Sequence, residues 1–555
     1  MPSFWPWRAR PVLDEETLRE DLDRIVAFYR DRGYYEAQAE YALEGHGRSV
    51  RIEIRVREGE PVRVSEREVV LPEGPWLATE EKGELLAALP LAPGAIFGAD
   101  PYREAREELL RRLANRGHPA ARIEGGAEVD LAARSARVHW QVDPGPPVRF
   151  GAVSVEGLLG VEQELVLAEL VFRQGDPFSQ DALDRSQKKV YELGLFRSVS
   201  LQARAPEPVP EGAPVPAEPR QWRVAVRVEE RPPRSVRVGV GYGSEDQFRA
   251  RISWLHRNFL GRARSLELAA KYSSLVAGVE GRVTQRRFLE PLLRLEADAS
   301  ALRETEPSFT ANRAGVGLTL IRPILPPWTG RVGYRFELAD VTDLDALDPS
   351  GAESARLGTL KLALERDTVD DKVAPRSGTH LELRAEPTLG ALGSDTDFVT
   401  LAAEGRAFLP VGPAVLALRL RLGAIEPVFG SDRSDVPIFK RFFSGGSNSV
   451  RGFDYQELGP RDANGEPLGG LTLTESTAEL RFPIWRFLEG VTFFDAGQVA
   501  RGPFAFDPDD LYYSAGPGLR VRTPLGALGL DWGYLLRRPP GVDRWRIHFS
   551  VESAF

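Results

Sequence analysis

The chain has 555 residues, too many for one ordinary core, so two or more folded units are expected. Its 42% hydrophobic and 28% charged residues exclude a disordered chain, and its net charge of −9 argues against a nucleic-acid-binding protein. The absence of cysteine excludes disulfides and thiolate chemistry. No stretch approaches the ~18 apolar residues of a membrane helix, but transmembrane strands of about 9–11 alternating residues stay compatible with the sequence.

The first 230 residues repeat one local pattern three times. In each copy a charged amphipathic helix ends at a glycine, and a strand follows. These glycines are Gly33, Gly117 and Gly194, and a glycine just after a helix favours a left-handed stop. Each copy closes with a Pro/Gly turn, in VREGEPVRV, VDPGPPVRF and VEERPPRSV. The period near 80 residues predicts β-α-α-β-β units at 1–60, 61–147 and 148–231.

The third copy is complete, and a proline-rich segment, 206–219, separates its last two strands. Its six prolines are too many for a strand. We interpret this segment as a long hairpin loop and not as an interdomain linker, because both flanking strands belong to one unit. The predicted elements of this copy are strand 148–155, helices 162–172 and 179–193, and strands 196–203 and 222–229.

The first copy is shorter than the other two. Few residues precede Asp14, so this copy lacks an opening strand and a first helix, and a unit cut in this way would struggle to bury a core. The opening MPSFWPWRARPV also lacks the apolar core of a signal peptide, so we predict an incomplete N-terminus.

The units of the first 230 residues leave edge strands unpaired. Two interpretations stay open, in which an extended client strand pairs with an edge or the units act only as spacers.

In the second part of the chain, helical periodicity gives way to alternation of apolar and polar residues. Near the C-terminus Trp545, Ile547 and Phe549 share one face, and polar residues occupy the other. A soluble sandwich shows the same alternation. Lipid is favoured because apolar faces recur without intervening helices, the chain stops on a strand ending in Phe555, and aromatic residues lie near strand ends. Those aromatic residues are Trp254, Phe259, Trp328, Tyr512 and Trp545.

These segments predict a sixteen-stranded antiparallel barrel, with the even strand number that places both termini on one side. A barrel in lipid must close, so strand 234–243 is expected to meet strand 545–555. The first of these strands contains Gly239, Gly241 and Gly243, which weaken strand packing and predict a weak lateral seam. The predicted strands of the 232–555 barrel are 234–243, 246–257, 264–273, 276–287, 292–303, 309–322, 328–340, 353–366, 377–388, 396–408, 414–425, 472–482, 490–497, 511–522, 526–535 and 545–555.

One long connection, 425–470, interrupts this series of strands, and a connection of that length is rare without a function. At its centre is SGGSNSVRGFDY, in which Arg451 precedes the turn-forming Gly452. The strands that follow supply two inward carboxylates, Glu479 and Asp495. We predict that the loop folds back into the barrel and that these carboxylates hold Arg451. The alternative is a solvated loop arginine.

Several motifs carry a family resemblance. The repeats ahead of a barrel, VRGF at Val450, Arg451, Gly452 and Phe453, FFDAG around Asp495, and a terminal aromatic residue resemble the BamA/TamA superfamily. This superfamily comprises outer-membrane assembly factors and two-partner secretion transporters with periplasmic POTRA domains. GPGLRVRTPLGALGLDWGY and LERDTVDDKVAPRSG also resemble segments of it. The similarity covers the whole chain and is greatest to the TamA type, although the shortened first repeat departs from that pattern.

The resemblance implies a location and a function. The barrel is expected in the outer membrane of a Gram-negative-type bacterium with its POTRA domains in the periplasm. There it would insert or translocate β-barrel or autotransporter-type clients by strand pairing at the seam. Arg451 is implied as the loop-tip arginine, Asp495 as its inner-wall partner, Glu479 as a second partner, and Phe555 as the end of a recognition strand. The implied partners are a TamB-like periplasm-spanning protein, unfolded clients and the lipid bilayer.

The residues indicate no enzyme. The six histidines are scattered without metal-ligand spacing, and neither a nucleophile elbow nor a phosphate-binding loop is present. We therefore expect no metal and no cofactor. Four alternatives to the TamA-type function stay open: a divergent BamA, a two-partner secretion pore, a passive porin-like channel, and a soluble β-rich adhesin.

Overall fold

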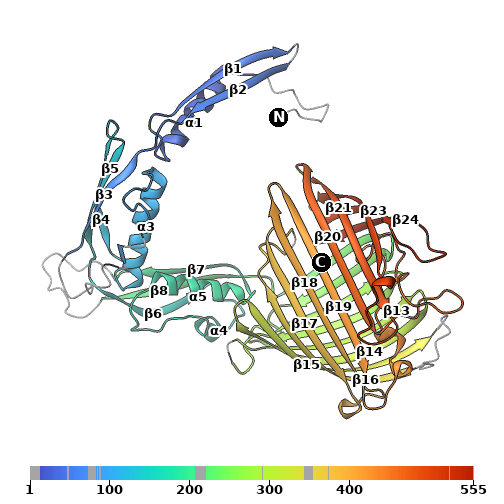
Figure 1. Cartoon of the computed structure of the whole chain (residues 1–555). Coiled ribbons are helices and arrows are strands. Elements are labelled where there is room, and N and C mark those ends of the chain that lie inside the picture. Colours follow the sequence, from blue (N-terminus) through green and yellow to red (C-terminus); the bar gives the residue numbers. More distant parts are fainter. Residues whose placement is uncertain are drawn as a thin grey trace. The chain divides into compact units, whose positions relative to one another are not determined.

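The computed structural model describes residues 13–46, 49–72, 83, 85–86, 89–206, 220–290, 292–342, 354–372, 374–523 and 526–553. The chain divides near residue 230 into two compact units, the first with the described α-helices and the second built around one large sheet (Figure 1). In the described part of the chain, no helix combines the length and apolar character needed to cross a membrane.

The first unit contains three small sheets in chain order. One sheet pairs β1 with β2, and the other two have the orders β3-β5-β4 and β6-β8-β7. In both three-stranded sheets the opening strand runs parallel to the last strand of its own repeat, so a helical crossover must join them. The elements are α1 (Glu15–Arg30), β1 (Gln38–His46), β2 (Ser49–Arg57), β3 (Arg63–Val70), α3 (Ala99–Asn115), β4 (Arg122–Asp130), β5 (Ser135–Asp143), β6 (Val148–Glu156), α4 (Gln163–Leu167), α5 (Gln180–Glu192), β7 (Phe196–Arg204) and β8 (Arg220–Glu230).

The third repeat differs from its prediction in one helix. α4 stops at Leu167, whereas the sequence predicted a helix over 162–172. The chain turns after α4 because the Val171 N–H donates to Ser186 Oγ on α5 at 3.0 Å, and Phe172 stacks on Phe150 with ring centroids 3.9 Å apart. β7 pairs antiparallel with β8, so the proline-rich segment joins two strands of one sheet, as predicted. Residues 207–219 of that segment lie outside the described residues.

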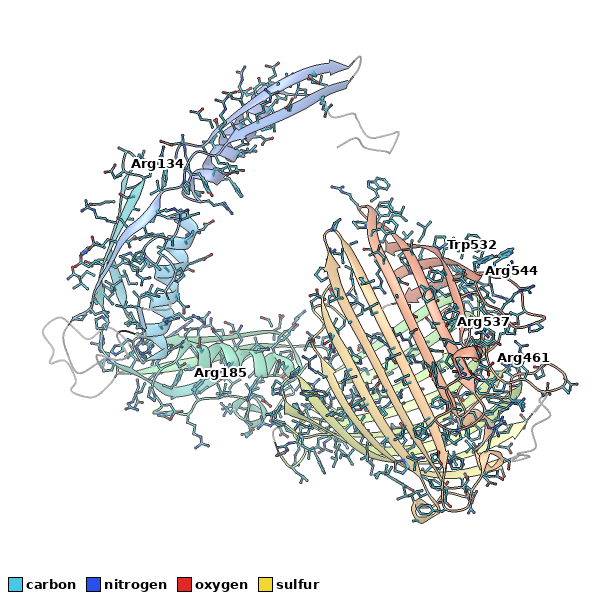
Figure 2. All side chains as sticks on the ribbon, viewed as in Figure 1. Arg134, Arg185, Arg461, Trp532, Arg537 and Arg544 are labelled. Atoms are coloured by element: carbon cyan, nitrogen blue, oxygen red, sulfur yellow. The ribbon has the colours of Figure 1, made fainter. Side chains whose placement is uncertain are left out.

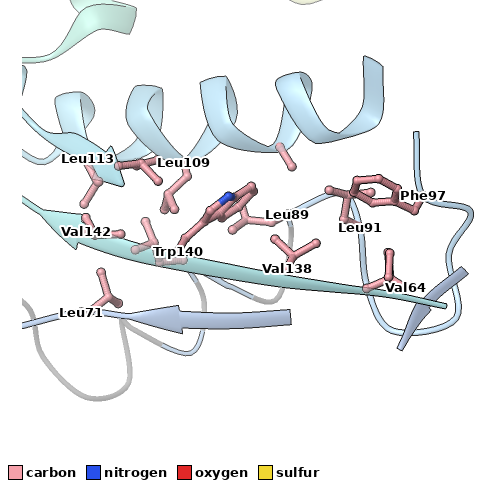
Figure 3. Close-up of a cluster of buried hydrophobic side chains, with 14 of the residues drawn as sticks. Val64, Leu71, Leu89, Leu91, Phe97, Leu109, Leu113, Val138, Trp140 and Val142 are labelled. Carbon is pink, nitrogen blue, oxygen red and sulfur yellow. The ribbon is translucent and has the colours of Figure 1, made fainter. Parts of the chain in front are cut away.

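The core of the second repeat lies between α3 and the sheet β3-β5-β4 (Figure 3). Leu109 and Leu113 lie one turn apart on α3, and both are fully buried. They pack in one cluster with Val138 and Trp140 from β5, the central strand. Trp140 places its indole N–H 3.0 Å from the Tyr102 hydroxyl, which satisfies its only buried polar group.

The three glycines of the repeat adopt the left-handed conformation that the sequence predicted. Their φ angles are 95° at Gly33, 92° at Gly117 and 74° at Gly194. Two of them also start the next repeat. The Gly33 carbonyl accepts a hydrogen bond from the Val62 N–H at 2.9 Å, and the Gly117 carbonyl accepts one from the Val148 N–H at 2.8 Å. Each of these two glycines therefore ends a helix and also binds the backbone at the start of the first strand of the next repeat.

We expect Gly33→Ala to destabilise the first unit more than Gly194→Ala. Both changes force a Cβ into the left-handed region, at about 1–3 kcal/mol. The Cβ at residue 33 would also lie 2.1 Å from the Phe97 carbonyl oxygen, whereas the Cβ at residue 194 meets nothing within 4 Å. Peptide-resolved hydrogen exchange in the full chain would measure the difference. Equal losses of protection around the two sites would contradict the close-contact explanation.

The second unit is a sixteen-stranded antiparallel sheet in which every strand pairs with the next in the chain. All sixteen predicted strands are confirmed. They are β9 (Arg234–Gly243), β10 (Gln247–His256), β11 (Ser265–Tyr272), β12 (Val276–Gln285), β13 (Arg294–Glu306), β14 (Phe309–Leu325), β15 (Trp328–Thr342), β16 (Ser354–Asp367), β17 (Gly378–Thr388), β18 (Phe398–Val411), β19 (Ala414–Pro427), β20 (Thr472–Trp485), β21 (Leu488–Ala500), β22 (Tyr512–Thr523), β23 (Gly526–Leu535) and β24 (Trp545–Ser553).

One face of this sheet is apolar and exposed, and the other carries the charged residues. On β9 the outer residues Val236, Val238 and Val240 are 59%, 68% and 65% exposed. Trp532, labelled in Figure 2, is 46% exposed on the same face. Such a surface suits lipid. One predicted aromatic residue differs, because Tyr512 packs edge-on against Phe453 of the inward loop.

Strands 234–243 and 545–555 meet at a weak seam, as predicted, and the barrel is only nearly closed there because β9 and β24 are not paired with each other within the described ranges. β9 and β24 are the two ends of the sheet. Among the described residues one backbone hydrogen bond joins their edges, from the Ser244 N–H to the Phe549 carbonyl at 3.0 Å. The β9–β10 turn thus falls opposite the middle of β24, so residues 545–548 of β24, which pair with β23 on one side, extend beyond the end of β9 on the other. Phe555, predicted at this seam, lies outside the described residues.

Candidate functional site

The long loop between β19 and β20 spans residues 428–471 and packs inside the barrel. Val450 and Phe453 on the loop are 1% and 0% exposed. They form one apolar cluster with Leu473, Val499 and Leu535 of the barrel strands. Burial of these apolar side chains holds the loop against the wall independently of its charges.

The guanidinium of Arg451 is held by two carboxylates of the inner wall. Its Nε and Nη2 donate to the two oxygens of Asp495, both at 2.9 Å, and its Nη1 donates to Glu479 Oε2 at 2.8 Å. The Arg451 backbone N–H also donates to Asp495, at 3.1 Å. Arg451 is 4% exposed and Asp495 is 0% exposed, so these are buried, charge-assisted and bidentate bonds.

Two more groups complete this site. The Arg451 guanidinium carbon lies 3.4 Å from the centroid of the Phe493 ring, and Asp531 Oδ2 lies 3.5 Å from its Nη1. Asp531 in turn accepts two hydrogen bonds from Arg520, both at 2.7 Å. Burial alone would lower the pKa of Arg451, but hydrogen bonding and charge from Asp495, with Glu479 and Asp531, raise that pKa above its usual value. The loop tip therefore stays cationic.

Glycines let the loop backbone reach the wall. Gly452 has a φ of 101°, a conformation that L side chains rarely adopt. Opposite it, a Cβ on Gly533 of β23 would lie 2.4 Å from the Gly452 nitrogen and 2.6 Å from the Arg451 carbonyl carbon. Gly533 belongs to the segment GPGLRVRTPLGALGLDWGY, which resembles the superfamily. The close contact with the loop tip gives a physical reason for a glycine at this position.

The loop has a second charged anchor on β15. Lys440 Nζ lies 2.8 Å from Glu337 Oε1, and Arg313 of β14 lies 2.9 Å from Glu337 Oε2. Glu337 is 2% exposed. Nearby, the Phe443 ring of the loop lies 6.1 Å from the ring of Phe309 on β14. The loop is therefore fastened to widely separated strands of the same barrel.

The structure brings together Arg451, Asp495 and Glu479, which the sequence singled out. It adds Asp531, which sequence reasoning missed as a partner although it alternates with apolar residues on 528–534. The seam glycines Gly239, Gly241 and Gly243 belong to β9, and the last two make room for neighbouring side chains. A Cβ on Gly241 would meet the Arg249 side chain at 2.5 Å, and one on Gly243 would meet Asp246 Oδ1 at 2.5 Å.

One group of described residues has side chains of the types that bind metal ions. Ligand atoms of Glu365, Asp367 and His380 lie within 4.8 Å of one another. However, Glu365 is ion-paired with Arg331, and Asp367 lies 3.5 Å from Lys372 Nζ. These cations already neutralise the carboxylates, so the arrangement is that of an ion-pair cluster on the barrel wall.

The fold and the site define a class of protein: a sixteen-stranded barrel with an inward loop, preceded by β-α-α-β-β units. Residues 258–555 match the Omp85 superfamily domain, and residues 5–59 and 148–231 match the POTRA model, described as surface antigen variable number repeat. The chain belongs to the Omp85 superfamily. This family and the barrel place it in an outer membrane, with its POTRA-type units in the periplasm.

Relatives and solved structures agree with this family. The chain is 27% identical to the outer membrane protein assembly factor BamA of Nitratidesulfovibrio vulgaris, over 98% of this chain and 68% of that protein. It is 24% identical to BamA of Neorickettsia risticii, over 97% of this chain and 72% of the relative. The crystal structure of Haemophilus ducreyi BamA lacking POTRA domains 1–3 superposes with a TM-score of 0.72 at 17% identity, covering 88% and 99% of the two chains, which supports the fold.

Proposed function

We propose that this chain is an outer-membrane protein assembly factor that inserts client β-strands by pairing at the seam between β9 and β24. The observation that carries the proposal is the pair of strand edges joined by a single backbone hydrogen bond among the described residues. Unpaired backbone groups are costly in lipid, so such an edge favours an added strand. The client's own folding would supply the driving force, and no nucleotide is required.

The relatives described above are BamA proteins, which favours the divergent-BamA alternative over the TamA type. A TamB-like partner belongs to the TamA-type alternative, and copurification from the membrane would support it.

The passive channel is the candidate from another class. The buried loop argues against it, because Val450, Arg451 and Phe453 are packed against strands of the barrel and do not leave the loop free in solvent.

A disulfide crosslink to a client tests the proposal, since the chain contains no cysteine of its own. Val240→Cys places a thiol on β9, and a second cysteine is placed in the last strand of a client barrel protein. We expect crosslinks during assembly in membranes whose yield depends on the register of the client cysteine.

Leu401→Cys is the matched control. Leu401 also faces outward, at 39% exposure, but its strand β18 is paired on both sides. Clients that fold normally while never crosslinking to residue 240, or that crosslink equally to residue 401, would refute strand pairing at the seam. A secretion pore or a passive channel would then replace it.

A further inference from the structure

The inward loop contacts both sides of the seam. On one side, the Ser447 N–H donates a short hydrogen bond to the carboxylate of Glu245, which lies in the turn between β9 and β10. On the other side, the Gly452 N–H donates to Nε2 of His548 on β24 at 3.2 Å. Neither Glu245 nor His548 belongs to the group that holds the Arg451 guanidinium.

The Glu245 carboxylate also faces the last strand. His548 is 3% exposed, and its Nε2 accepts a hydrogen bond, so the neutral ring carries its proton on Nδ1. Nδ1 lies 3.8 Å from Glu245 Oε1. The carboxylate is seated closely against the loop, because a Cβ on Gly446 would lie 2.6 Å from the same oxygen. One carboxylate of the first hairpin thus meets the loop and β24 together.

An ion pair also ties the loop to β24, two residues before His548. Arg546 Nη1 lies 2.7 Å from Asp454 Oδ2. The direct contacts between the two edges involve Phe549. Its carbonyl accepts a hydrogen bond from the Ser244 N–H at 3.0 Å, its N–H donates to Ser244 Oγ at 3.4 Å, and its ring lies 6.4 Å from that of Tyr242. The loop therefore adds a second connection between the first hairpin and the last strand.

We propose that Glu245 is a positioning residue that keeps the seam shut through the inward loop. With Arg546 and His548, the loop stays attached to β24. Glu245 attaches the first hairpin to that loop, and loss of this attachment frees β9 and β10 to move away from β24. This role rests on the proposed function, because it concerns access to the strand edge with which a client would pair. The contact between Glu245 and the loop itself exists in the barrel without a client.

Pulsed electron spin resonance on the full chain in lipid vesicles, without client, tests this proposal. Nitroxide labels are attached at Val240→Cys and Ile547→Cys, two outward positions that are 65% and 53% exposed on opposite sides of the seam. We expect Glu245→Ala to increase the population at longer distances about tenfold, which corresponds to losing one hydrogen bond to a charged group. Glu245→Gln, which keeps an acceptor oxygen and the side-chain shape, should give a smaller increase.

Asp246→Asn is the matched control. Asp246 lies in the same turn, but its ion pair is with Arg249 of the same hairpin at 3.4 Å. An unchanged distance distribution in Glu245→Ala, or the same change in Asp246→Asn, would overturn the proposal. Labels at Leu338 and Leu401, away from the seam, verify that the barrel is folded in each variant.

The client crosslink described above separates this inference from the proposed function. An opened seam in Glu245→Ala with no change in crosslinking to residue 240 supports the role of Glu245 and counts against insertion at the seam. An opened seam with increased crosslinking supports both.

Discussion

Arg451→Ala is expected to release the inward loop and to destabilise the folded barrel by about 3–5 kcal/mol, the effect of breaking a buried ion pair on one side. The reason is that Asp495, 0% exposed, and Glu479, 7% exposed, would each lose a cationic partner inside the barrel. Cleavage of the loop by an added protease, and the conductance of the barrel in a planar bilayer, would measure the release. Both should be low in the parent chain and higher in the variant.

Arg461→Ala is the control for this prediction. Arg461 is an arginine of the same loop, but its guanidinium binds the loop's own carbonyls at Gly465 and Glu457, at 3.0 and 2.6 Å. Its removal should leave the loop docked. Arg451→Lys keeps the charge but not the bidentate geometry, so an intermediate effect is expected. A loop equally resistant to protease in Arg451→Ala and in the parent would contradict the structural role of the ion pair.

Gly533→Ala is expected to displace the loop tip without removing any charge. The new Cβ would lie 2.4 Å from the Gly452 nitrogen, and overpacking of this kind amounts to about 1–3 kcal/mol before the Arg451 contacts are disturbed. The neighbouring backbone belongs to the tip itself, so no flexible side chain can move aside. Loop cleavage by protease should rise, as in Arg451→Ala, and chemical denaturation should occur at lower denaturant concentration.

Gly405→Ala on β18 provides the comparison, because a Cβ there meets nothing within 4 Å. It should leave both the loop and the denaturation midpoint close to those of the parent. If Gly533→Ala and Gly405→Ala behave alike, the close approach of the loop to β23 does not limit the residue at position 533.

Sequence reasoning reached most of the fold because the two halves differ in periodicity. Alternation along 234–553 predicts strands one by one, and the repeated glycines mark where helices stop. The strand ends were less predictable: β14 continues to Leu325 and β18 to Val411, a few residues beyond their predicted limits. Hydrogen bonding to a neighbouring strand decides where a strand ends, and that neighbour's extent is a tertiary property.

The site was predictable where the residue types of a motif indicated an interaction by themselves. A single arginine at a glycine-rich loop tip, followed by strands with inward carboxylates, indicated Arg451, Asp495 and Glu479. Glu245 and the pair Lys440–Glu337 were missed. Their sequence surroundings are ordinary turns and alternating strands, and Lys440 and Glu337 are separated by 103 positions. Only the path of the loop across the barrel brings such residues together.

Local sequence patterns predict the architecture: three helix-containing repeats, sixteen alternating strands and one long loop that carries Arg451. These follow from local period and composition, which each segment carries alone. Barrel closure and the attachment of the loop depend on the tertiary structure. β9 ends opposite the middle of β24, and this register places Glu245 beside the loop and His548. Strand register and loop path depend on all sixteen strands together, which no local pattern records.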